Sequence, residues 1–180
     1  MSEVQVASRY AKSLIDLAKE QKVLDSIKDD IELFLKTCRV TPVLRAVLKN
    51  PIISPSKKIA ILKDVFKDIL HSLIFSFFAI VIKKGRSGIL YSTAKEFINE
   101  YNIYNNITTA RVTSAVALSE ENKKKMIDIV KNVTKGDVIL TENINPQLIG
   151  GFVLNVGDKQ IDTTILSQLQ KVKKEFSKKW

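Results

Sequence analysis

Apolar residues recur every three to four positions through the first 105 residues of the chain, which is the spacing of amphipathic helices. Two of the segments begin with proline, at Thr41-Pro42 and Ser54-Pro55. Proline is favoured in the first turn of a helix, where the backbone N–H has no partner within the helix, so both positions support helix starts. The pattern predicts six helices, over residues 3–20, 22–38, 41–50, 54–66, 69–82 and 89–104.

The fifth predicted helix is apolar on nearly every side, apart from a stripe of Ser72, Ser76 and Lys83. It is too short to cross a bilayer, which takes about 20 apolar residues. It is therefore predicted to be the central helix of a bundle.

The pattern changes at Asn105-Asn106, a plausible hinge. Residues 107–117 alternate like a strand, and a helical segment follows Ser119. Three further strands and a final amphipathic helix are predicted over residues 138–144, 149–156, 159–161 and 165–176. The expected class is α+β: a helical bundle over residues 1–105 and a small α/β domain over residues 106–180. A domain of this size has a thin core and often depends on a partner.

The net charge of +10 raises the alternative of a basic nucleic-acid-binding protein. Its densest basic runs, residues 123–125 and 173–174, lie on predicted helices beside apolar positions, as solvated helix faces do. The aromatic residues Phe75, Phe77 and Phe78 lie in an apolar run and are not interleaved with basic residues as stacking platforms. This alternative stays second.

No constellation of side chains in the sequence suggests catalysis, a metal or a cofactor. His71 is the only histidine and lies in the apolar fifth segment, and Cys38 is the only cysteine. The single thiol excludes an internal disulfide and suits a cytosolic compartment, as does the N-terminus, which has no secretory pattern. Gly150-Gly151 precedes strand-like residues and does not open a helix. The pair is therefore predicted to form a bulge or bend at the start of a strand. One of the two glycines is expected to have a backbone conformation that a residue with a Cβ disfavours.

Two helices carry more apolar surface than the others. The first is apolar over about half its circumference, and the fifth almost all round. Such faces can be sealed inside a compact bundle, or they can form a groove that accepts a helix from another protein.

Several motifs, taken together, resemble one family. Arg9-Tyr-Ala-Lys-Ser-Leu14 is similar to the first helix of the delta subunits of F-type ATP synthases and of their mitochondrial counterpart, the oligomycin-sensitivity-conferring protein. Further resemblances are Leu48-Lys-Asn-Pro51 and Ile82-Lys-Lys-Gly-Arg86. The most specific is the run Val138-Ile-Leu140, Ile144-Asn-Pro146, Leu148-Ile-Gly-Gly-Phe152 and Val156-Gly-Asp158. Asn145 and Asn155 depart from the commoner pattern of the family.

The resemblance implies a non-catalytic stator subunit of a proton-translocating ATP synthase, peripheral on the cytoplasmic face of a bacterial inner membrane. It implies that the N-terminal helix of an alpha subunit lies in a groove between helices one and five, and that the C-terminal domain contacts the b subunits of the peripheral stalk. No cofactor, direct nucleic-acid contact or homo-oligomer is expected.

The residues expected at each contact follow from the apolar faces. Those expected in the alpha-subunit groove are Tyr10, Leu14, Ile15, Phe77 and Val81. The stalk candidates are Leu166, Leu169, Val172 and Phe176, whose alternative role is packing on the domain's own sheet.

Overall fold

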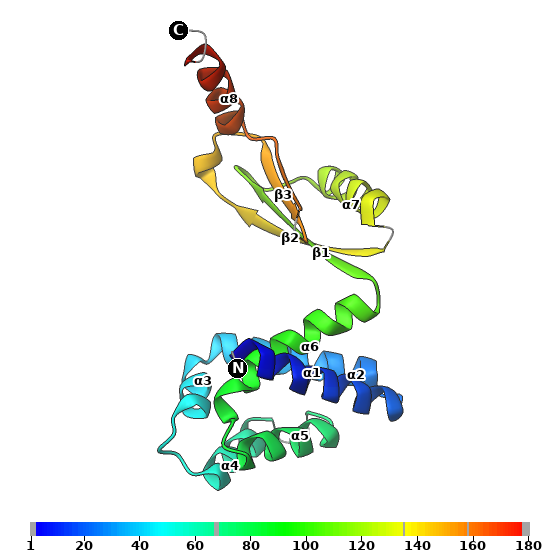
Figure 1. Ribbon diagram of the computed structural model, residues 1–180, viewed down its shortest axis with the longest axis vertical. Coiled ribbons are helices and arrows are strands. Elements are labelled where there is room, and N and C mark those ends of the chain that lie inside the picture. The colour runs from blue at the N-terminus through cyan, green and yellow to red at the C-terminus, as the bar shows by residue number, and fades with distance from the viewer. Residues whose placement is uncertain (1–2, 67–68, 135, 158, 178–180) are drawn as a thin grey trace. The chain divides into compact units, whose positions relative to one another are not determined.

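The structure is a computed structural model that describes residues 3–66, 69–134, 136–157 and 159–177. It divides into two compact units, Met1–Tyr101 and Asn102–Trp180 (Figure 1). The predicted α+β class, a six-helix bundle followed by a small α/β domain, is confirmed. The boundary expected after residue 105 falls at the end of the sixth helix, a little beyond this division.

The N-terminal unit is built on aromatic and aliphatic packing between helices. Its elements are α1 (Glu3–Glu20), α2 (Leu24–Val40), α3 (Pro42–Lys49), α4 (Pro55–Val65), α5 (Ser72–Lys83), the short 3-10 helix η1 (Ser87–Ile89) and α6 (Leu90–Tyr104). The ring of Phe34 on α2 lies 4.9 Å from that of Phe78 on α5 and 5.7 Å from that of Phe66, all three fully buried or nearly so. These contacts join three segments that are distant in sequence.

Helix α5 contributes Phe78 to this packing but is not buried on all sides as predicted, since Ile80 is 52% exposed, and both of its ends are capped. It begins at Ser72 and not at residue 69, because the Nδ1 atom of His71 accepts a hydrogen bond from the Leu73 N–H, 3.2 Å long. At the other end Gly85 takes a positive φ of 71°, and the N–H groups of Gly85 and Arg86 bond back to Ile82 and Val81. The basic segment 83–86 is thus a helix C-terminus with a glycine cap.

A buried lysine ties the start of α4 to the rest of the bundle. The Lys58 Nζ donates to the carbonyl oxygen of Leu48 at 3.0 Å and to the Ser87 Oγ at 2.8 Å, and the Ser87 hydroxyl also donates to Leu48. The Lys58 residue is only 5% exposed. Replacing it removes the donor to the buried Ser87 hydroxyl and leaves the Leu48 carbonyl oxygen with only the Ser87 hydroxyl as a donor.

We expect Lys58→Ala to lower the unfolding free energy of the N-terminal unit by about 2–3 kcal/mol. The exposed neighbour Lys57 offers a matched control, since Lys57→Ala should stay within about 0.5 kcal/mol of the parent. Urea denaturation followed by helical circular dichroism measures both. Equal stabilities of the two variants would contradict the assigned role.

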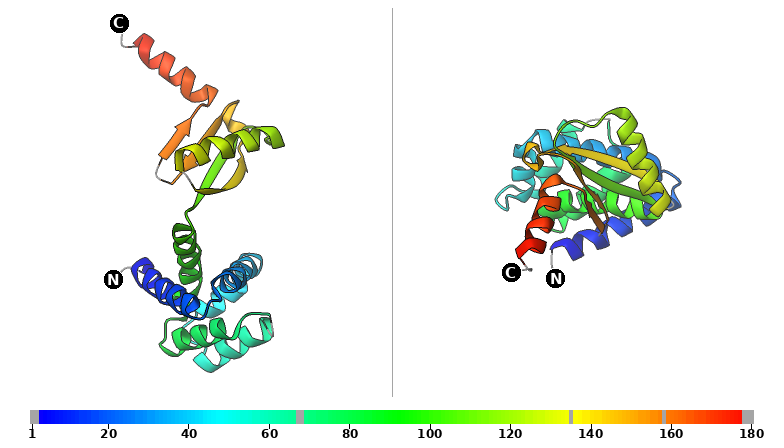
Figure 2. Two further views of the ribbon diagram at one scale, coloured as in Figure 1. Left: turned by 90° about the vertical axis from the view of Figure 1, so that its right-hand side faces the viewer. Right: turned by 90° about the horizontal axis from the view of Figure 1, so that it is seen from above.

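The C-terminal unit is a four-stranded sheet covered on one face by a helix (Figure 2). Its elements are β1 (Ile107–Ser114), α7 (Glu120–Thr134), β2 (Asp137–Ile144), the 3-10 helix η2 (Pro146–Leu148), β3 (Phe152–Val156), β4 (Lys159–Asp162) and α8 (Ile165–Ser177). The strand order is β2-β1-β3-β4, with β1 and β2 parallel and the other pairs antiparallel. Met126 and Val130 of α7 pack on the inward side chains Ala110, Val112 and Leu154, which gives the thin core that the sequence predicts.

The link between β2 and β3 differs from the prediction. Residues 149–151 were expected to begin the third strand, but β3 begins at Phe152 because η2 and a tight turn occupy the preceding residues. Gly151 has a positive φ of 78°, and a Cβ there would overlap the carbonyl oxygen of Thr163. Gly150 has an ordinary φ, and a Cβ there would meet only the end of the Ile165 side chain, at 2.7 Å. Gly151 is therefore the glycine with the predicted conformation, one that a residue with a Cβ disfavours. Asp158, which is part of the family resemblance, lies outside the described residues.

Candidate partner-binding surfaces

Helices α1 and α5 enclose a groove on the surface of the bundle, hereafter the α1–α5 groove. It consists of two hollows, one of 190 Å³ between α1 and Arg86, which follows α5, and one of 280 Å³ between α1 and α5. The first is lined by Val6, Arg9, Tyr10, Ser13 and Arg86, and the second by Leu17, Gln21, Ser72, Leu73, Ser76, Phe77 and Ile80. Leu17 and Ile80 are the large apolar side chains that it leaves open to solvent, 39% and 52% exposed.

Tyr10 and Phe77 form the floor of the groove. Their rings meet edge to face with centroids 6.1 Å apart, and so link α1 to α5. The Nη1 atom of Arg86 donates to the Tyr10 hydroxyl at 3.1 Å. A cationic group thus stands beside an aromatic floor, and the groove around it has both polar and apolar side chains, which suits an amphipathic partner helix with an acceptor near its end.

Three of the five residues predicted for this groove lie beneath it. Leu14, Ile15 and Val81 are at most 5% exposed and belong to the bundle core. This corrects the prediction, because the middle of each apolar arc packs inside the bundle and only its edges reach the surface. An aspartate at Leu14 would bury an unpaired carboxylate and so would test folding, not binding.

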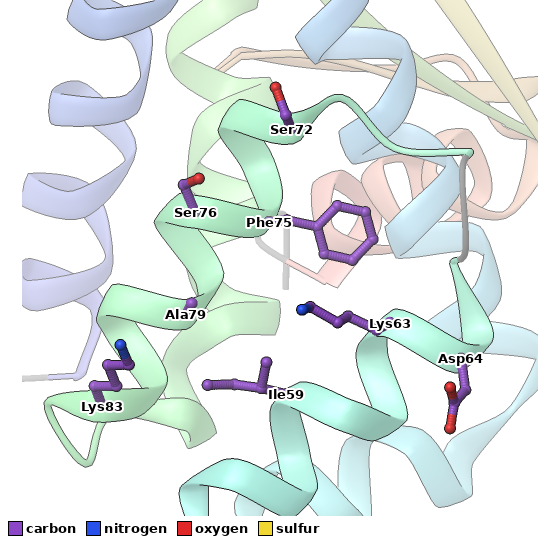
Figure 3. Close-up of a pocket in the computed structure, with 8 residues that line it drawn as sticks. All are labelled: Ile59, Lys63, Asp64, Ser72, Phe75, Ser76, Ala79 and Lys83. Atoms are coloured by element: carbon purple, nitrogen blue, oxygen red, sulfur yellow. The ribbon is translucent and has the colours of Figure 1, made fainter.

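A further, larger hollow of 780 Å³ lies between α5 and α4, and it shares Ser72 and Ser76 with the lining of the groove (Figure 3). Its lining combines apolar Ile59, Phe75 and Ala79 with the polar Ser72 and Ser76 and the charged Lys63, Asp64 and Lys83. Phe75 and Lys63 extend toward one another across it. The sequence analysis did not find this hollow, because α4 has a weak apolar stripe and gives no signal of a second open side.

In the C-terminal unit the apolar face of α8 is open to solvent. The four predicted stalk residues, Leu166, Leu169, Val172 and Phe176, are 40%, 57%, 48% and 68% exposed. In the described part of this unit, the hydrophobic cluster under α7 includes no side chain from α8. In the described structure this face therefore does not pack on the domain's own sheet, which was the alternative role.

The spacing of the exposed side chains on α8 indicates what could cover them. Ile165, Leu169, Val172 and Phe176 follow one another at intervals of four, three and four residues, and Ile165 is 44% exposed. This is the heptad spacing of a helix that pairs with another helix. We call these four residues the α8 seam.

Hydrogen bonds at its first turn stabilise α8 without the help of packing on the sheet. The Thr164 hydroxyl accepts from the Ser167 N–H, as an N-cap does. Asp162 accepts from the Ser167 hydroxyl at 2.6 Å and from the N–H and hydroxyl of Thr164, and these bonds lower the pKa of its carboxyl. These bonds satisfy donor groups in the first turn of a helix whose apolar face is unpacked.

Two of the three lysines in the basic run at residues 123–125 form ion pairs within the unit. Lys123 pairs with Glu120 and Glu142, each at 3.1 Å, and Lys125 pairs with Glu121 at 2.7 Å. The Glu142 carboxylate also accepts from the Leu118 N–H, and this bond, followed by that to Lys123, lowers its pKa. Lys123 and Lys125 therefore lie on a solvated, ion-paired helix face, which favours the first of the two interpretations of this run.

The two side chains best suited to chemistry have structural positions. Cys38 is completely buried in the bundle, and this burial raises the pKa of its thiol to about 11. His71 caps α5.

Across residues 3–66, 69–134, 136–157 and 159–177, no three metal-ligating side chains come together. Over the same ranges, no helix combines the length and hydrophobicity needed to cross a bilayer.

Comparisons with known proteins agree on one family. The family described as ATP synthase delta (OSCP) subunit matches residues 6–176. The chain is 39% identical to ATP synthase subunit delta of Amoebophilus asiaticus, covering 98% of this chain and 96% of that protein. It is 33% identical to the chloroplastic ATP synthase subunit delta of Ochrosphaera neapolitana, over 96% and 97% of the two chains.

A solved structure shares the fold. A chain in the cryo-EM structure of the Toxoplasma gondii mitochondrial ATP synthase hexamer superposes with a TM-score of 0.73 at 15% identity, covering 94% of this chain and 96% of that one. None of these findings supports the nucleic-acid alternative.

Proposed function

This chain belongs to the ATP synthase delta (OSCP) subunit family, and we propose that it joins the catalytic headpiece of an ATP synthase to the peripheral stalk. It is a stator subunit. In the proposal, the α1–α5 groove binds the N-terminal helix of an alpha subunit, and the α8 seam binds the b subunits. The complex would hold the protein at the cytoplasmic face of a bacterial inner membrane.

The observation that carries this proposal is an open apolar surface on each of the two units. Leu17 and Ile80 flank the groove in one, and the seam runs along α8 in the other. A stator resists torque from the rotor, so it has to bind at both ends. Two separately folded units with different helix-binding surfaces meet that need.

We also propose that the subunit itself catalyses no reaction. Its only histidine caps a helix, and its only thiol is buried and protonated at neutral pH. Both roles are structural, which supports a connector whose contribution to ATP synthesis is mechanical.

Ile80→Asp tests the groove. Because Ile80 is half exposed, the bundle should remain folded, while the affinity for a peptide of the alpha-subunit N-terminal helix falls by at least about tenfold, measured by calorimetry. Ala79→Asp makes the same charge change one residue away, on the side of the α4–α5 hollow, and should leave the affinity unchanged. The reverse pattern would assign the helix to the α4–α5 hollow, and no effect of either change would exclude both sides of α5.

A further inference from the structure

The turn between η2 and β3 contains an isoleucine in a backbone conformation that isoleucine disfavours. Ile149 has φ 65° and ψ −43°, and the Gly150 N–H bonds back to the Leu148 carbonyl oxygen at 2.6 Å, which closes a γ-turn around it. A positive φ is a genuine outlier for a β-branched residue. Glycine, which follows immediately in the chain, would adopt this conformation at lower cost.

Packing inside the domain does not account for the isoleucine. Its side chain is 67% exposed, and it belongs to neither hydrophobic cluster of the described structure. The residue therefore carries backbone strain and gains little burial in return. Backbone strain of this kind persists only where the surrounding structure holds it, and it is concentrated at functional sites.

The neighbouring structure fixes the turn from both sides. On one side, the Asn145 side chain accepts from the Gln147 N–H at 3.1 Å and so starts η2, a bond that the aspartate commoner in the family makes equally well. On the other side, the Ile165 N–H donates to the Gly150 carbonyl oxygen at 3.2 Å, and Gly151 packs against the backbone of Thr163. These contacts hold Ile149 in place and put the turn against the first residue of the α8 seam.

We propose that Ile149 is an anchor for the helical partner that covers the α8 seam, and that the turn is strained in order to present this side chain to it. The inference rests on the proposed function, since it takes the partner to be the b subunits of the stalk. The seam offers a helix a row of apolar side chains beginning at Ile165, and the hydrogen bond from the Ile165 N–H to the Gly150 carbonyl oxygen holds the exposed Ile149 one residue away from that backbone contact. An apolar group fixed in advance loses little conformational freedom on binding.

Two substitutions in the full-length protein distinguish the effect of the backbone strain at residue 149 from the effect of its side chain. Ile149→Gly removes both, so it should raise the urea midpoint of the C-terminal unit and weaken binding to the soluble region of the b subunits at least tenfold. Ile149→Ala keeps a Cβ and most of the strain, so it should weaken binding similarly without raising the midpoint. Hydrogen exchange of β1 and β3 reports the stability, and calorimetry reports the affinity.

Leu169→Asp, in the middle of the seam, distinguishes failure of this inference from failure of the proposed function. If it abolishes stalk binding while Ile149→Gly binds as the parent does, Ile149 is not an anchor and the seam remains the binding surface. If neither change affects binding, both proposals are wrong. A lower midpoint for Ile149→Gly would make Ile149 a folding residue and overturn the inference. A dimer of this chain that the same substitutions dissociate in sedimentation would assign the surface to a second copy and also overturn it.

Discussion

Replacing Gly151 with alanine should lower the unfolding free energy of the C-terminal unit by about 2–4 kcal/mol. Two costs combine. The backbone has a positive φ of 78°, and the new Cβ would overlap the Thr163 carbonyl oxygen, which belongs to the backbone and cannot rotate away. Because the core of this unit is thin, such a loss is a large part of its stability.

Gly150 provides the matched control. A Cβ there meets only the Ile165 Cδ1, the end of a side chain that can change rotamer, so Gly150→Ala should cost less than about 1 kcal/mol. Hydrogen exchange resolved by segment measures both variants, and the amides of α2 and α5 should keep the protection of the parent. Equal losses at the two glycines would show that the positive φ of Gly151 is not what matters.

The second large effect is expected in binding. Leu169→Asp should reduce affinity for the soluble region of the b subunits about 100-fold, because it places a charge in the middle of an apolar seam that a partner helix would desolvate. The helix itself should persist, since Leu169 is 57% exposed and α8 is capped by Thr164. Surface plasmon resonance gives the affinity, and circular dichroism reports the helix content.

Gln170→Asp introduces the same side chain at the next position, outside the seam, and should bind within about twofold of the parent. If the two variants weaken binding equally, the effect is one of net charge and not of the seam. If both bind as the parent does, the stalk contacts the domain elsewhere.

The sequence was sufficient to predict the helices and strands because their periodicities differ and proline and glycine mark their ends. Pro42 and Pro55 open α3 and α4, and Gly85 ends α5. What periodicity could not predict is which part of an apolar arc stays open. The middle of the arc, Leu14 and Val81, is buried by neighbours from distant parts of the chain.

The edges of the same arcs are the side chains that remain available. Leu17 and Ile80 have the same apolar character as the core residues beside them, so only the positions of the surrounding helices distinguish them. In the described part of the C-terminal unit, no α8 side chain joins the hydrophobic cluster, and the predicted face of α8 is also the exposed one. The turn at Ile149 was missed for a different reason, since a β-branched residue next to a strand locally favours β structure, and only contacts with residues 163–165 impose the turn.

The central claim is that one chain holds two partners through two separate surfaces. The most direct measurement is the affinity of Ile80→Asp and of Leu169→Asp, in the full-length protein, for both the alpha-subunit N-terminal helix and the soluble region of the b subunits. The account predicts a crossed result, in which Ile80→Asp loses the alpha helix and keeps the b subunits while Leu169→Asp does the opposite. If either variant loses both partners while remaining folded, or if neither loses any, the two surfaces do not have the separate roles proposed for them.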